Sequence, residues 1–131
     1  MKLKMRKEYF GNSYICTLHD VFDKEQGVIR ITVKSVDNED CGEIDFFCVA
    51  KRYRHTKHKY GKELLNSVIN DMYKDRNVRT FMVYPRGEEL YDECEEVMDV
   101  DTLCIIYEKL GFELVGLSSD KHPKMIMKYI P

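Results

Sequence analysis

The sequence predicts an α/β domain of the α+β kind, in which one mixed, mostly antiparallel sheet is accompanied by two main helices. Two observations support this fold class. In the first part of the chain apolar and polar side chains alternate, as in Val28–Val33, with the period of a β-strand. From Gly61 onward apolar side chains recur at helical spacing, and strand-like runs return afterwards. A helix that connects two neighbouring strands of one sheet makes those strands parallel, so the sheet is expected to be mixed.

The composition is that of a single soluble globular domain spanning residues 1–131. Of the 131 residues, 44% are hydrophobic and 34% are charged, which is enough for one hydrophobic core. The net charge of −2 provides no general attraction to nucleic acid. The amino terminus is followed by no apolar stretch long enough for a signal peptide or a membrane span.

The amino-terminal strands are expected within residues 8–50. Tyr9–Leu18 is rich in aromatic and β-branched residues around Gly11-Asn12, and Val28–Val33 lies between two polar turns. The run from Gly42 to about Ala50 is apolar on both faces in its centre. That pattern predicts a buried central strand.

The first helix is expected to begin near Gly61 and to end at Asp75-Arg76-Asn77. The strand Val78–Tyr84 follows it and is stopped by Pro85-Arg86-Gly87. One side of the helix is apolar; its members are Leu64, Leu65, Val68, Ile69 and Met72.

A second helix precedes the last two strands. Asp101 or Thr102 is predicted to cap its start, and Gly111 is predicted to end it. The strands Phe112–Leu117 and Lys124–Ile130 then close the chain. The apolar stripe of this helix consists of Leu103, Ile106, Tyr107 and Leu110.

Charge is separated along the chain. Residues 51–62 hold six Lys or Arg and two His with no acid, whereas residues 87–101 hold eight acids and no base. The basic run leads from a strand into a helix, where free N–H groups and the helix dipole favour an anion such as a phosphate. A solvated surface is the alternative for either run. The segment 88–101 reads as loop or as loosely helical.

The five cysteines predict a reducing, cytoplasmic location, because their number is odd and no C-x-x-C pair occurs. Cys16, Cys48 and Cys104 lie in apolar runs, where a reduced thiol behaves as a small hydrophobe. For Cys48 a buried structural thiol is favoured over a nucleophile, because spacing provides no partner base. His55 and His58 lack a nearby acid or cysteine to complete a metal site, so no metal is expected.

Three segments resemble the GCN5-related N-acetyltransferase (GNAT) family. Tyr107–Glu113 reads Tyr-Glu-Lys-Leu-Gly-Phe-Glu, which is similar to the end of the family's fourth helix and the start of its sixth strand. Thr80–Pro85 resembles a fifth strand that ends in Tyr-Pro, and Met125–Tyr129 resembles the closing strand. The resemblance covers residues 42–130, the acyl-CoA-binding half. The chain shows no candidate for the family's first two helices, so it would be a trimmed member with an open acceptor side.

The pyrophosphate loop departs from the family's Arg/Gln-x-x-Gly-x-Gly/Ala motif. In Thr56–Gly61 only the final glycine matches, and Lys59 stands at the middle glycine position. A lysine there adds bulk where the backbone should approach the pyrophosphate, while Lys57, Lys59 and Lys62 add positive charge.

The resemblance implies that acetyl-CoA is the co-substrate and that the central parallel strands splay apart to bind it. The pantetheine arm would lie along the backbone of Phe47, Cys48 and Val49. The remaining predicted acyl-CoA contacts are Lys57, His58, Lys59, Tyr60, Gly61 and Lys62.

The resemblance also implies transfer of the acetyl group to a primary amine. Tyr107 would protonate the departing thiolate, for which a phenol of pKa about 10 is a reasonable acid; a core aromatic is the alternative. Glu43, which shares a strand face with Asp45, would be the general base, with ordered water or a merely structural carboxylate as alternatives.

A lysine side chain, another basic acceptor or a polyamine would suit the acidic stretch, and the chain could also form a homodimer. Two other functions remain open. One is a catalytically inactive GNAT-fold domain that binds proteins or regulates them. The other is nucleic-acid binding through the basic run, which includes Tyr53 and Tyr60, although the net negative charge and the lack of an RNA-binding motif argue against it.

Overall fold

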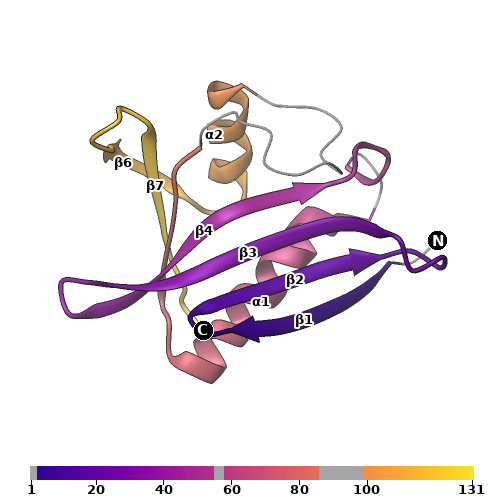
Figure 1. Cartoon of the computed structure of the whole chain (residues 1–131). Helices are drawn as coiled ribbons and strands as arrows, with labels where there is room; N and C mark the ends of the chain where they lie inside the picture. Colours follow the sequence, from indigo (N-terminus) through magenta and orange to yellow (C-terminus); the bar gives the residue numbers. More distant parts are fainter. Residues whose placement is uncertain (1–2, 55–57, 86–98) are drawn as a thin grey trace.

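The computed structural model describes residues 3–54, 58–85 and 99–131 (Figure 1). In that part of the chain one seven-stranded sheet has the order β1-β2-β3-β4-β5-β7-β6, and two α-helices accompany it. The predicted mixed, mostly antiparallel sheet with two main helices is therefore confirmed. The elements are β1 (Lys4–Phe10), β2 (Ser13–His19), β3 (Glu25–Val36), β4 (Glu39–Val49), the 3-10 turn η1 (Lys51–Tyr53), α1 (Tyr60–Arg76), β5 (Thr80–Val83), α2 (Val100–Lys109), β6 (Glu113–Leu117) and β7 (Pro123–Lys128).

The amino-terminal strands β1 to β4 form an antiparallel meander. The predicted run Tyr9–Leu18 turns back at Gly11, whose φ of +58° suits a glycine, and its two arms belong to β1 and β2. β1 begins at Lys4, within a basic stretch that sequence analysis did not assign to a strand. This strand forms one edge of the sheet and exposes most of its side chains, so it needs no apolar alternation.

Side chains of the β1–β2 hairpin hold it against α1. The Tyr14 hydroxyl donates to Asp71 at 2.7 Å, and Lys7 Nζ lies 2.7 Å from the same carboxylate. Burial alone would raise the pKa of Asp71, but the hydrogen bonds from Lys7 and Tyr14 outweigh it and lower the pKa. Residues 3–54 contain no α-helix, as predicted, and this hairpin directly connects the first two strands.

α1 covers one face of the sheet, behind β2, β3 and β4 in Figure 1. Its buried stripe contains the five predicted apolar residues together with Tyr60. The helix ends as predicted, at Arg76, with Asn77 in the left-handed conformation. Ile29 and Ile31 of β3 are fully buried in the same core as the helix.

β4 is parallel to β5 for only part of its length. The paired residues run from Cys41 opposite Thr80 to Ile44 opposite Val83. On the β3 side the register shifts, so that Asp45 has no partner and forms a bulge. A bulge bends a strand and increases its twist. β4 continues to Val49 without β5, so the predicted splaying of the central parallel pair is confirmed.

α2 packs against β6 and β7. Its start differs from the prediction: Asp99, rather than Asp101 or Thr102, is the N-cap, and its side chain accepts from the Thr102 N–H at 2.7 Å. The predicted helix start was too far toward the carboxyl terminus, because the apolar stripe begins one turn after the true start. Gly111 ends the helix as predicted, with a φ of +103°.

The cysteines follow the predictions only in part. Cys16, Cys41 and Cys104 are free thiols. Cys48 is disulfide-bonded, so the prediction of a reduced thiol at this position was wrong. Pairing between distant cysteines depends on the fold and cannot be read from their spacing. Among the described residues, no helix is both long and apolar enough to cross a membrane.

Gly42 lies in the paired part of β4, opposite Phe81 of β5. A Cβ there would come within 2.8 Å of the Phe81 ring and 2.9 Å of Ile31 Cγ2, both fully buried. We therefore expect Gly42→Ala to lower the free energy of unfolding by about 1–3 kcal/mol, the usual cost of overpacking a core. Urea denaturation measures the change.

Gly61→Ala is the matched control, because a Cβ at Gly61 would make ordinary contacts at 3.6 Å and 3.9 Å. Equal destabilisation by the two substitutions would contradict this description of the packing.

Candidate functional site

The candidate site lies where β4 extends beyond its pairing with β5. Beyond Ile44 one edge of β4 still pairs with β3, through Phe46 to Val49, while no strand of the described residues pairs with the edge toward β5. Backbone N–H and C=O groups on such an edge can bind an extended ligand. One carbonyl in this stretch is already used, because Val49 accepts a hydrogen bond from Arg54 Nε at 2.6 Å.

The start of α1 lies directly against this free part of β4. A Cβ on Gly61 would be 3.6 Å from Phe47 Cζ and 3.9 Å from Val49 Cγ2. The N-cap is Lys59, and no side chain of the described residues caps the helix. The first N–H groups of a helix have no partner within it, so this end can accept an anion.

The basic residues near this helix start differ in exposure. His58, Lys59 and Lys62 are exposed, and the His58 ring pairs with Glu63. Tyr60 is buried, with its ring packed 4.3 Å from that of His58 and 5.7 Å from that of Tyr53, measured between centroids. The Tyr60 side chain is therefore closed to a ligand, and its backbone N–H already donates to the His58 carbonyl at 3.0 Å. Lys57 lies outside the described residues.

Tyr107 reaches this region from α2. Its ring centroid is 6.4 Å from that of Phe47 and 5.5 Å from that of Phe112. The side chain is 6% exposed, and burial raises its pKa above the usual value of a phenol. None of the described residues forms a hydrogen bond with its hydroxyl, whereas the hydroxyl of the equally buried Tyr14 is bonded to Asp71. The phenol therefore remains protonated at neutral pH and its O–H is available to a ligand.

Glu43 lies on the other face of the sheet. It pairs with Thr32, whose neighbour Ile31 points into the α1 core, so Thr32 and Glu43 share the face opposite α1. Phe47 pairs with Ile29 and therefore lies on the α1 face with Tyr107. The structure thus brings Phe47, Val49, Gly61 and Tyr107 together and leaves Glu43 across the sheet.

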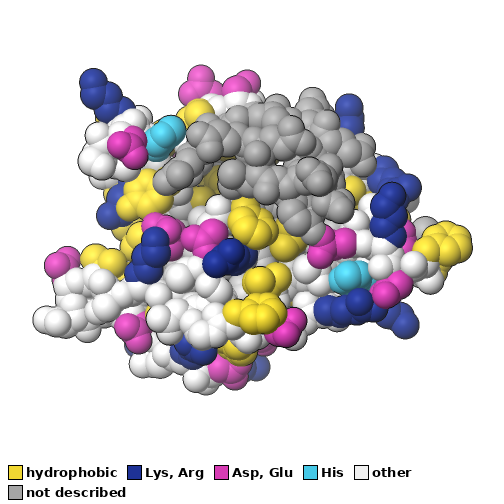
Figure 2. Space-filling view, viewed as in Figure 1, with side chains coloured by type: hydrophobic (Ala, Val, Ile, Leu, Met, Phe, Trp, Pro, Cys, Tyr) yellow, Lys and Arg dark blue, Asp and Glu magenta, His cyan; other side chains and the backbone are white. Residues whose placement is uncertain are grey.

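Ion pairs hold the two carboxylates of β4. Lys34 Nζ lies 2.5 Å from Glu43, and this hydrogen bond raises the pKa of the lysine. Asp45 accepts a hydrogen bond from Thr32 and lies 3.4 Å from Arg30 Nε. Figure 2, which looks onto the face opposite α1, shows basic, acidic and hydrophobic side chains interspersed. Glu43 is therefore a half-buried, paired carboxylate, which differs from the solvated edge carboxylate that sequence analysis considered.

Known structures share this architecture. The chain superimposes with a TM-score of 0.64 on a protein described as an acyl-CoA N-acyltransferase from Klebsiella pneumoniae, with 11% identity over 91% of this chain and 74% of that one. A GNAT-family acetyltransferase from Staphylococcus aureus gives a TM-score of 0.62, with 18% identity over 88% of this chain and 68% of that one. The fold is that of the acyl-CoA N-acyltransferases.

A mutant of the spermidine N-acetyltransferase from Vibrio cholerae also has this fold, with a TM-score of 0.63 and 11% identity over 92% of this chain and 66% of that one. No family model matches the sequence. No curated protein matches it either. At these sequence identities the comparisons show that the chain has the acyl-CoA N-acyltransferase fold, and they show the fold alone.

Two residues of this site and the bulge in β4 escaped sequence analysis. Lys34 and Arg54 act as partners of Glu43 and of the Val49 carbonyl, and the bulge at Asp45 bends β4. The alternation along Val28–Val33 continues to Lys34 and could have indicated a cross-strand pair with Glu43. The bulge left no comparable signal, because it depends on the register between strands.

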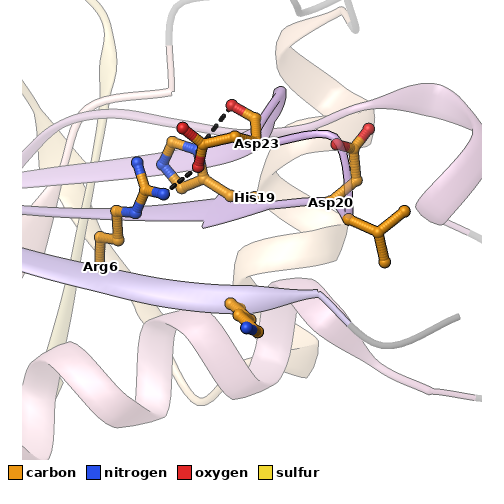
Figure 3. Close-up of a pocket in the computed structure, with 6 residues that line it drawn as sticks. Arg6, His19, Asp20 and Asp23 are labelled. Carbon is orange, nitrogen blue, oxygen red and sulfur yellow. Dashed lines mark hydrogen bonds and ion pairs between the residues drawn. The ribbon is translucent and has the colours of Figure 1, made fainter.

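A separate pocket of about 230 Å³ lies among β1, β2 and the β2–β3 turn (Figure 3). Arg6 and His19 turn toward Asp23, and Arg6 forms an ion pair with its carboxylate. Asp20 points away from them and accepts hydrogen bonds from the N–H groups of Phe22 and Lys24. These contacts stabilise the turn, and the pocket belongs to elements other than those that carry Tyr107. No group of three His, Cys, Asp or Glu in the described residues could hold a metal ion.

The two buried phenols Tyr107 and Tyr14 should respond differently to loss of the hydroxyl. Tyr14→Phe removes the 2.7 Å bond to Asp71 and should lower the free energy of unfolding by about 1 kcal/mol. Tyr107→Phe removes no bond to a described residue and should change it by less than about 0.5 kcal/mol. Urea denaturation of both variants measures the difference. A larger loss in Tyr107→Phe would show that its hydroxyl has a structural role.

Proposed function

We propose that this protein is an acetyl-CoA-dependent N-acetyltransferase that acts on a primary amine. The observation that carries the proposal is the divergence of β4 from β5 next to the start of α1, which no described side chain caps, with Tyr107 buried beside the gap. Acetyl-CoA is a thioester that carries a pyrophosphate. A strand edge can bind its extended arm, a helix start can bind its pyrophosphate, and a proton donor can protonate its leaving thiolate. The acyl-CoA N-acyltransferase fold supports this assignment.

Acetyl-CoA would bind along this gap. The backbone of Phe47, Cys48 and Val49 would hold the pantetheine arm in the manner of an added strand. The pyrophosphate would lie at the start of α1, near the N–H groups of Gly61 and Lys62. The remaining proposed contacts to the phosphates are Lys57, His58, Lys59 and Tyr60.

The reaction moves two protons and one acetyl group. The neutral amine attacks the thioester carbonyl, its nitrogen forms a bond to the carbonyl carbon, and the carbon–sulfur bond breaks to release the thiolate of CoA. Tyr107 would donate its phenolic proton to that sulfur. A base removes the proton that the amine loses.

Burial makes Tyr107 a weaker acid than a free phenol, which at first argues against this role. The thiolate would form in the same apolar surroundings, next to Phe47 and Phe112, and these disfavour its charge as well. Since desolvation raises the pKa of both groups, the proton transfer retains its driving force.

Glu43 is the proposed base, and Lys34 controls its availability. The ammonium group of Lys34 lies 2.5 Å from this carboxylate and fixes its position. Because Glu43 lies on the face opposite α1, the amine would approach from that face while the thioester enters from the gap. Ordered water remains the alternative base.

The acceptor is proposed to be a small polyamine or a lysine side chain. The Vibrio cholerae protein with this fold acts on spermidine, a polycation. The acidic stretch 87–101 has the charge to attract such a cation, and most of it lies outside the described residues. The dependence on acetyl-CoA suits a cytoplasmic location, although a disulfide such as that of Cys48 is rare there.

A catalytically inactive protein-binding or regulatory domain is the second candidate function. Two observations favour it: Arg54 occupies the Val49 carbonyl, and Lys59 replaces the middle glycine of the family's loop. Both would weaken acetyl-CoA binding without changing the fold.

Thermal melting with and without acetyl-CoA separates the two functions. A ligand at a hundredfold excess over its dissociation constant raises the apparent stability by about 3 kcal/mol. We expect such a shift together with acetylation of polyamines or lysine peptides. No shift with acetyl-CoA or CoA would contradict the binding site, and a shift without turnover would favour the inactive domain.

Within the same assay, Tyr107→Phe should lower turnover while it preserves the acetyl-CoA shift. Glu43→Gln should also lower turnover, most strongly toward acidic pH, where fewer amines are neutral and a base is needed most. An unchanged rate in either variant would remove that residue from the mechanism.

A further inference from the structure

The turn η1 follows directly on the stretch of β4 that is proposed to hold the pantetheine arm. Its backbone is well anchored. The Ala50 N–H donates to the Gln26 carbonyl at 2.8 Å, and the Tyr53 N–H donates to the Ala50 carbonyl at 2.9 Å. Arg52, in the middle of this turn, is therefore presented from a fixed point at the end of β4.

Two ring contacts connect Arg52 to the start of α1. Its guanidinium carbon lies 5.4 Å from the centroid of the Tyr53 ring, in a cation–π contact. The Tyr53 ring in turn meets that of Tyr60, the first residue of α1, edge to face, with 5.7 Å between the centroids. The guanidinium group is thus held in the neighbourhood of the helix start without being part of it.

The guanidinium group of Arg52 has donors to offer. Arg52 is exposed, and within residues 3–54, 58–85 and 99–131 no carboxylate forms an ion pair with it. Its charge also acts on Asp20, but both oxygens of that carboxylate already accept hydrogen bonds, from the β2–β3 turn and from Gln26. The N–H groups of Arg52 can therefore bind an anion from solution.

CoA carries a phosphate that the proposed contacts do not yet distinguish. Its pantetheine arm, assigned to β4, lies on one side of the pyrophosphate, and adenosine lies on the other. The ribose of that adenosine carries a 3′-phosphate, a monoester with a charge of about −1.5 to −2 at neutral pH. A guanidinium group suits such a phosphate, because two parallel N–H groups can bind two of its oxygens.

We propose that Arg52 binds the 3′-phosphate of CoA and selects ligands that carry this group. The inference rests on the proposed function, because it requires the pyrophosphate of acetyl-CoA at the start of α1. Lys59 and Lys62 belong to that helix start and are needed at the pyrophosphate. Arg52 approaches from the neighbouring turn, through two rings, and so serves a separate phosphate beside it.

Titration calorimetry of the full chain with CoA and with 3′-dephospho-CoA tests the proposal. We expect the wild type to bind CoA at least about tenfold more tightly, as one charge-assisted phosphate contact provides. Arg52→Gln should weaken the binding of CoA about tenfold and leave that of 3′-dephospho-CoA unchanged.

Arg79→Gln is the matched control. Arg79 is also exposed, and its guanidinium carbon lies 5.6 Å from the centroid of a tyrosine ring, that of Tyr73. It follows the opposite end of α1, so this variant removes the same charge and the same kind of ring contact far along the helix. Both dissociation constants should stay unchanged in it.

The outcomes separate this proposal from the proposed function. Equal dissociation constants for the two ligands in the wild type would overturn the 3′-phosphate site and leave the acetyl-CoA site intact. An equal loss of both ligands in Arg52→Gln, or an equal loss in Arg79→Gln, would also overturn it, because the effect would then be one of general charge. If the wild type binds neither ligand, the acetyl-CoA function fails and this site fails with it. Circular dichroism establishes that each variant is folded.

Discussion

The separation of β4 from β5 is the feature on which the rest of the site depends. Four pairs hold the two strands together, from Cys41–Thr80 to Ile44–Val83. The bulge at Asp45 then bends β4, and beyond it β3 is the only strand of the described residues that pairs with β4. The part of β4 beyond this pairing carries Phe47, which lies next to Gly61 of α1 and packs beside Tyr107 of α2.

Rigid packing on either side keeps the gap in place. Where β4 and β5 are still paired, Phe81 packs directly on Gly42, so these parts of the two strands are held closely together. Farther away, hydrogen bonds and an ion pair fix the β1–β2 hairpin to α1 through Asp71. The hairpin itself has a turn of two residues, Gly11 and Asn12, and no described helix covers the sheet face opposite α1.

Sequence analysis predicted the fold well where local chemistry determines structure. The apolar stripe of α1, the ends of both helices at Asn77 and Gly111, and the parallel central pair all have local signals. It failed where the outcome depends on distant partners. β1 is a strand because β2 pairs with it, Asp45 is a bulge because of β3, and Cys48 is bonded to another cysteine rather than reduced.

The site residues also divide into those with a local signal in the sequence and those that depend on distant contacts. A resemblance in residues 107–113 predicted Tyr107, and the structure places it beside the predicted strand residue Phe47. The ion pair between Lys34 and Glu43 and the use of the Val49 carbonyl by Arg54 depend on contacts across strands and loops. These contacts decide how available each predicted group is, and single-sequence patterns contain little information about them.

Hydrogen exchange measured with and without acetyl-CoA tests the central claim most directly, because it reports backbone protection at the gap itself. The account predicts slower exchange in residues 45–49 of β4 and in Gly61–Glu63 at the start of α1, with no change in β1 or β6. Protection elsewhere in the chain, or none when acetyl-CoA is bound, would contradict the claim that the divergence of β4 from β5 is the acyl-CoA site.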